Sequence, residues 1–126
     1  MTSTNAEWQE RKLAAMARGQ GNIAPVYIER GENAELWDVE GNRYIDFGTG
    51  IAVCITGHSN PRVVAAVKDQ VERFSHTCVM VTPYDSAVRL AEKLNELAPG
   101  DSPKKSMFVT TGAEAVENTI KIARAY

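Results

Sequence analysis

The sequence has little of several features that mark specialised classes of protein. It contains 2 cysteines in 126 residues, too few for a disulfide framework. No apolar run approaches the roughly 20 residues of a membrane-spanning helix, and the first residues are too polar for a secretory signal. The formal net charge is only -2, which offers no basic surface to nucleic acid or to a membrane. With 44% hydrophobic residues, the composition predicts a globular protein of the cytoplasm.

The two cysteines each have a histidine nearby, which raises the question of a metal site. Cys54 precedes His58, and His76 precedes Cys78. Neither spacing is an established zinc pattern, and Cys78 leads into the apolar run 79–81. We therefore expect no metal site and interpret both cysteines as buried and unreactive.

A β-hairpin is predicted in the first half of the chain. Residues 35–39 and 43–47 are rich in strand-forming side chains. Gly41 and Asn42 between them fit a two-residue hairpin turn. That turn would set Glu40 opposite Arg43, a favourable pair of opposite charges.

Two aspartates and two glycines close to the hairpin invite a catalytic interpretation. Asp38 and Asp46 could be paired carboxylates, but aspartates that support turns are more frequent, so we interpret both as structural. Gly48 and Gly50 lack the third glycine of a dinucleotide fingerprint, and no helix is expected to open there. They indicate either a bend into a buried strand or a close approach of the backbone to a ligand.

Helices account for most of the remaining chain. The side chain of Asn60 and the ring of Pro61 mark the start of one helix. Other helical patterns cover residues 6–17, a segment from Asp85 to Pro99, and the residues after Thr111. The apolar residues 107–109 predict a buried strand before the last helix.

The most informative segment is the start of that last helix. Thr111 and Glu114 have the capping-box spacing, in which a hydroxyl and a carboxylate satisfy each other's backbone N–H groups. Gly112 and Ala113 would then be the first helical residues, with N–H groups that lack intrahelical partners. These groups either bind water or form an anion site at the positive end of the helix dipole. Gly112 would let a phosphate approach the backbone closely.

The strand predicted at residues 107–109 is the only central strand of a parallel sheet that this sequence predicts. Strand–helix units of this kind belong to parallel sheets of several strands, covered on both faces. We therefore expect the chain to be the opening portion of a larger α/β protein.

Three groups of motifs resemble the N-terminal part of the class III aminotransferases. They are the run from Leu36 to Phe47, the segments Gly50–Val53 and Gly57-His58, and the loop and helix from Thr110 to Arg124. The resemblance implies the α/β fold of aspartate-aminotransferase-type (fold type I) pyridoxal-phosphate enzymes. Residues 1–59 would form the N-terminal helix, arm and hairpin, and residues 60–126 the start of the large cofactor-binding domain.

The resemblance also implies roles for four residues. Gly112 and Ala113 would bind the phosphate of pyridoxal phosphate through their backbone N–H groups. Relatives frequently have serine at the position of Ala113, so one side-chain hydrogen bond would be missing. Ile51 matches a position that lines the substrate pocket and packs on an aliphatic amine. Met80 matches a pocket position that carries a polar amide in some relatives.

The segment 75–84 is most similar to the 4-aminobutyrate branch of the family. The implied function is transfer of an amino group from 4-aminobutyrate to 2-oxoglutarate by a homodimer or a higher homo-oligomer. Other donors, such as ornithine, acetylornithine or β-alanine, remain alternatives, as does a truncated, non-catalytic interaction module. No lysine of this chain matches the family's Schiff-base motif, so no catalytic residue is assigned and the chain alone is not expected to be active.

Overall fold

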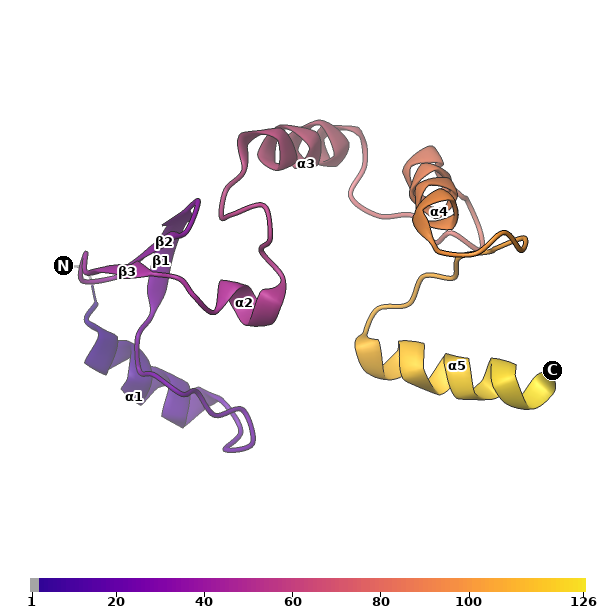
Figure 1. Ribbon diagram of the computed structural model, residues 1–126. Helices are drawn as coiled ribbons and strands as arrows, with labels where there is room; N and C mark the ends of the chain where they lie inside the picture. Colours follow the sequence, from indigo (N-terminus) through magenta and orange to yellow (C-terminus); the bar gives the residue numbers. More distant parts are fainter. Residues whose placement is uncertain (1–2) are drawn as a thin grey trace. The chain divides into compact units, whose positions relative to one another are not determined.

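The computed structural model describes residues 3–126 of the chain. The chain divides into two units, residues 1–73 and residues 74–126, and Figure 1 shows the elements of each. Each unit is described on its own. The sequence predicts a domain boundary between residues 59 and 60 of the complete enzyme. That boundary stays a prediction.

The first unit begins with a capped helix, α1 (Asn5–Ala15). Thr4 Oγ1 accepts the Glu7 N–H at 3.2 Å, and the Glu7 carboxylate accepts the Thr4 N–H at 2.9 Å. This capping box satisfies two backbone donors that the helix itself leaves free. The helix predicted over residues 6–17 is confirmed, with its start one residue earlier and its end two residues earlier.

A three-stranded antiparallel sheet follows, in the order β1-β2-β3. Its strands are β1 (Ile28–Glu32), β2 (Glu35–Asp38) and β3 (Arg43–Ile45) (Figure 1). β2 and β3 are the predicted hairpin. β1 is the strand that the sequence did not reveal, because its residues are mostly charged and include Gly31, which is unfavourable in strands.

The predicted hairpin register is wrong. Arg43 pairs with Trp37 instead of Glu40, so the connection is longer than two residues. The Arg43 guanidinium instead forms an ion pair with the Glu35 carboxylate, also from β2. Gly41 has a φ of 83° in the connection, a conformation that glycine adopts without steric cost.

Hydrogen bonds to Asp38 hold the connection between β2 and β3. Its carboxylate accepts the backbone N–H groups of Glu40 and Asn42 at 3.0 and 2.8 Å. The Tyr44 hydroxyl and the Asn5 amide also donate to it, both at 2.9 Å. Asp38 is the one residue with a relative exposure of 0% in the described part of the chain. Its predicted structural role is confirmed, since it joins the turn, β3 and α1.

The rest of the first unit consists of a short turn and a helix. α2 (Thr49–Ala52) contains backbone with positive φ, where the sequence predicted no helix. α3 (Pro61–Arg73) begins as predicted, and Asn60 Oδ1 accepts the Arg62 N–H at 3.0 Å. The proposed bend into a buried strand after Gly50 is not formed.

The second unit contains two helices, α4 (Asp85–Leu97) and α5 (Gly112–Ala125). Both begin where the sequence predicted. Residues 107–109 form no strand, which corrects the prediction of a buried one. Their side chains are 38–57% exposed, because the described chain offers them no neighbouring strand with which to form a ladder.

No apolar side chain is buried in the part of the chain that the structure describes. The apolar stripe of α3 is therefore open, with Val67 60% and Val71 59% exposed.

Cys54 is half-buried and Cys78 exposed, both as free thiols, so the prediction of buried cysteines is wrong. Among residues 3–126, no helix is long and apolar enough to cross a membrane.

Candidate functional site

The first turn of α5 has the geometry that the sequence predicted. Thr111 Oγ1 accepts the Glu114 N–H at 3.2 Å. The Glu114 carboxylate accepts the N–H groups of Thr111 and Thr110 at 2.9 and 2.8 Å. The Glu114 carboxylate, the only one in the first turn of α5, therefore accepts hydrogen bonds from residues that precede the helix.

Two N–H groups remain available at this helix end. Gly112 and Ala113 are the first two residues of α5, and neither donates a hydrogen bond within residues 3–126. Both residues are exposed, and a Cβ built on Gly112 would meet no atom within 4 Å. The positive end of a 14-residue helix with free, accessible donors is suited to bind an anion.

Ile51 lies in a left-handed turn in the first unit. The φ angles of Thr49, Gly50, Ile51 and Ala52 are 45°, 64°, 60° and 61°. The side chain of Ile51 points away from its own unit, since the residue is 95% exposed. A strained backbone at residues other than glycine is frequent at functional sites, so the turn supports the hypothesis that Ile51 lies at one.

Met80 is 94% exposed in the second unit. It lies in a turn in which the Val81 and Thr82 N–H groups donate to the Cys78 carbonyl at 2.9 and 2.8 Å. Gly112 and Ala113 are thus adjacent in α5, whereas Ile51 and Met80 lie in different units. The binding roles of all four residues stay predictions.

Sequence reasoning missed one pair of side chains near Ile51. The His58 Nε2 and Asp46 Oδ2 atoms lie 2.6 Å apart, and both side chains are largely covered, at 22% and 11% exposure. The hydrogen bond from His58, supported by the Thr49 N–H, lowers the pKa of Asp46. The spacing of 12 residues gave no signal for this pair, since it matches neither a helix nor a hairpin.

No group of three or more metal-ligating side chains occurs among residues 3–126.

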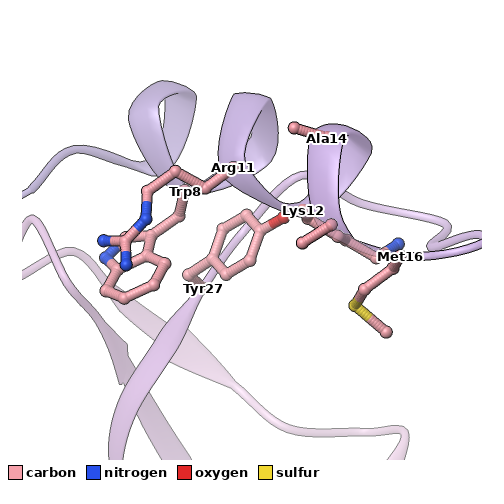
Figure 2. A pocket seen from close by; sticks show the side chains of 7 residues that line it. Trp8, Arg11, Lys12, Ala14, Met16 and Tyr27 are labelled. Carbon is pink, nitrogen blue, oxygen red and sulfur yellow. The ribbon is translucent and has the colours of Figure 1, made fainter.

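A pocket of about 670 Å³ lies beside α1 (Figure 2). In it, the rings of Trp8 and Tyr27 stack with centroids 6.2 Å apart, and the Arg11 guanidinium lies 4.0 Å from the Trp8 ring. None of the predicted binding residues lines this pocket.

A family model described as aminotransferase class-III matches residues 15–126. The chain is therefore a member of the class III aminotransferases. This confirms the resemblance seen in the motifs, and with it the α/β fold of fold type I.

Two similar curated relatives are named for 5-aminovalerate and for 4-aminobutyrate. DavT of Pseudomonas aeruginosa, a 5-aminovalerate aminotransferase, is 53% identical over 99% of this chain and 29% of its own length. GabT of Escherichia coli, a 4-aminobutyrate aminotransferase, is 50% identical over 98% of this chain and 29% of its own length. The chain thus spans less than a third of the curated relatives that it matches.

Solved structures of the family show the same fold. An acetylornithine aminotransferase from Elizabethkingia anophelis is 30% identical, with a TM-score of 0.86 over 98% of this chain and 31% of its own. An ornithine aminotransferase from Toxoplasma gondii is also 30% identical, with a TM-score of 0.81 over 98% of this chain and 28% of its own. The latter holds pyridoxal phosphate (PLP) at partial occupancy in its active site, in agreement with the family's dependence on this cofactor.

The residues of this chain fit the phosphate end of that cofactor. The phosphate needs hydrogen-bond donors and positive potential, and the start of α5 provides both. The open space around Gly112 allows the close approach that a Cβ would hinder.

Proposed function

We propose that this chain is the N-terminal portion of an aminotransferase that transfers the amino group of 4-aminobutyrate to 2-oxoglutarate. The observation that carries the proposal is the start of α5, where the N–H groups of Gly112 and Ala113 are free beside an unobstructed backbone. Half of the residues of this chain are identical to those of a relative named for 4-aminobutyrate. We further propose a cytoplasmic homodimer, in which the partner subunit adds phosphate contacts.

In this proposal, the site residues of the chain bind either the cofactor or the amino donor. Gly112 and Ala113 hold the phosphate and so anchor one end of the cofactor. Ile51 packs on the aliphatic part of the amino donor, and Met80 occupies a pocket position that affects the choice of donor. PLP supplies an electron sink that stabilises negative charge on the substrate carbon.

The remaining chemistry belongs to polypeptide beyond these residues. Transamination requires a lysine that binds the cofactor and transfers a proton, and a carboxylate that keeps the pyridine nitrogen protonated. Of the lysines in this chain, Lys93 and Lys121 form exposed ion pairs within their helices, and none stands in the family's Schiff-base motif. The contribution of this chain is therefore binding and orientation.

A second donor, 5-aminovalerate, is a candidate because two relatives are named for it, at 53% and 51% identity. Relatives named for 4-aminobutyrate reach the same identity, 53% for an enzyme of Mycobacterium tuberculosis, so identity alone does not separate the two donors. The two donors differ by one methylene group, which a hydrophobic pocket discriminates by about 1–3 kcal/mol. Ornithine and acetylornithine are supported less, since the structures named for them are 30% identical. The comparisons do not favour the non-catalytic interaction module.

The test is a donor panel with the purified full-length enzyme. Glutamate formation from 2-oxoglutarate is measured with 4-aminobutyrate, 5-aminovalerate, ornithine, acetylornithine and β-alanine, for PLP-loaded and for cofactor-free enzyme. We expect the highest kcat/KM for 4-aminobutyrate, followed by 5-aminovalerate, and no activity in cofactor-free enzyme. A preference for ornithine or acetylornithine would contradict the assignment of the donor, and activity without PLP would contradict the whole proposal.

A further inference from the structure

The turn that carries Ile51 requires support from its surroundings. Thr49, Ile51 and Ala52 all adopt positive φ without being glycine. A left-handed conformation is unfavourable for each such residue, and it persists only where neighbouring groups over-determine it. Within the turn, the Gly48 carbonyl accepts the N–H groups of Ile51 and Ala52 at 2.8 and 3.1 Å, and these bonds alone do not tie it to the sheet.

Asp46 provides the tie at the start of the turn. Its Oδ1 atom accepts the backbone N–H groups of Gly48 and Thr49 at 3.0 and 2.8 Å. Its Oδ2 atom lies 2.6 Å from His58 Nε2. One carboxylate thus joins the first residues of the left-handed turn to a histidine 12 positions later.

His58 is itself held firmly on the sheet. Its backbone N–H and carbonyl form a two-way bridge with Asn33, at 2.8 and 3.0 Å. Its side chain packs on Gly31 of β1, where an added Cβ would lie 2.8 Å from His58 Cγ. Gly57, directly before it, has a φ of 80°, and a Cβ there would lie 2.9 Å from Asn33 Cα. The histidine therefore has little freedom to move.

We propose that Asp46 and His58 are a positioning pair that holds the left-handed turn and thereby determines how far Ile51 projects toward the amino donor. This inference rests on the proposed function. It gives the pair a role in selecting the chain length of the amino donor. Neither side chain touches the donor. The pair acts through the backbone of residues 49–52, and the expected effect of losing it is a change in selectivity.

The test compares variants of the full-length enzyme that break or keep the pair. His58→Leu removes the ring nitrogen that meets Asp46, whereas His58→Gln keeps a side-chain amide that can reach the carboxylate. Gly31→Ala crowds the imidazole without altering either partner, although its Cβ also lies 2.9 Å from Leu36 Cδ2, and Gly19→Ala is its control, since a Cβ at Gly19 meets no atom within 4 Å. The Gly31 variant keeps the test valid if His58→Leu does not fold.

Two measurements are made on each variant. Amide hydrogen exchange by mass spectrometry reports the stability of residues 47–56, with α5 as an internal reference. The ratio of kcat/KM for 4-aminobutyrate to that for 5-aminovalerate reports donor selection. For His58→Leu and Gly31→Ala we expect faster exchange in residues 47–56 alone and a change in the ratio of at least about threefold. His58→Gln and Gly19→Ala should match the wild type.

Unchanged exchange in both disruptive variants would overturn the proposal, whatever the activity of the enzyme. Faster exchange with an equal loss for both donors would also overturn it, because the pair would then be merely structural. If the wild-type enzyme uses neither donor, the proposed function fails, and with it the selective role, while the exchange data still show whether the pair holds the turn.

Discussion

Thr111 and Glu114 satisfy each other's backbone at the start of α5. The Thr111 hydroxyl oxygen accepts the Glu114 N–H at 3.2 Å, and the Glu114 carboxylate accepts the Thr111 N–H at 2.9 Å. The two residues between them, Gly112 and Ala113, keep their N–H groups available. The capping box thus stabilises the N-terminal end of α5. It leaves free the N–H groups that can donate hydrogen bonds to a phosphate.

The absence of a hydroxyl at Ala113 gives a first prediction. Ala113→Ser in the full-length enzyme places a donor beside the two free N–H groups and restores the residue frequent in relatives. We expect tighter PLP binding by about 1 kcal/mol, the net contribution of one hydrogen bond. An absorbance titration of cofactor-free enzyme measures it, and weaker binding would contradict the position of the phosphate.

A second prediction separates the backbone of Ile51 from its side chain. Ile51→Gly removes the apolar contact but suits a φ of 60°, so the turn should be as stable as in the wild type or more stable. Ile51→Gln also removes the contact and keeps the strain. Both variants should lower kcat/KM for 4-aminobutyrate and leave the PLP absorbance spectrum unchanged.

The control for these variants is Ile23→Gln, at a side chain that is fully exposed, for which kcat/KM should match the wild type. An equal loss with every amino donor would instead point to a general structural role for Ile51.

Asp38 gives a prediction on pH. Burial acts to raise its pKa, but hydrogen bonds from Asn42, Asn5 and Tyr44 outweigh burial and hold the pKa well below its ordinary value. A carboxyl whose pKa is lowered by folding stabilises the protein above its unfolded pKa of about 3.9. That contribution is lost as pH falls through the lower pKa of the folded state.

The measurement is the difference in Tm between wild type and Asp38→Asn in the full-length enzyme from pH 7 to pH 2. The variant should melt lower at neutral pH, and the difference should shrink below about pH 4. The exposed Asp101 provides the control substitution, Asp101→Asn. A difference in Tm that stays constant with pH would show that Asp38 acts through its shape and not through its charge.

The isolated chain of 126 residues gives a further prediction. Because no apolar side chain is buried among the described residues, the apolar faces of its helices have no core to cover. Expressed alone, the chain should be aggregated or molten, with ANS binding and little near-UV circular dichroism. A cooperative unfolding transition of the monomer would contradict this and would favour the non-catalytic module.

Local features were predictable from the sequence because neighbouring residues determine them. The helix starts at Thr111 and Asn60 depend on side chains within three positions of the backbone that they cap. The capping box of α1 had the same signal, since Glu7 follows Thr4 by three residues. Such contacts form wherever the chain turns into a helix, whatever lies around it.

Features that depend on distant residues were missed. The hairpin register follows from the contacts of Asp38 with four other residues, one of them in α1. The left-handed turn at residues 49–52 includes threonine and isoleucine, which do not favour positive φ. In our proposal the turn is held by the contact of Asp46 with His58, which lies 12 positions away in the sequence. Residues 107–109 have the composition of a strand but form none, because strands need partners.

The measurement that tests the central claim most directly is the affinity of the full-length enzyme for PLP when Gly112 is replaced by valine. A β-branched side chain there would stand where the phosphate must approach. Gly19→Val is the matched control, since a Cβ at either glycine meets no atom within 4 Å in this chain. Circular dichroism and Tm confirm that both variants fold. We predict that Gly112→Val weakens PLP binding at least about tenfold, or 1.4 kcal/mol, while Gly19→Val binds as the wild type does. Unchanged affinity in a folded Gly112→Val enzyme would contradict the claim that α5 binds the cofactor phosphate.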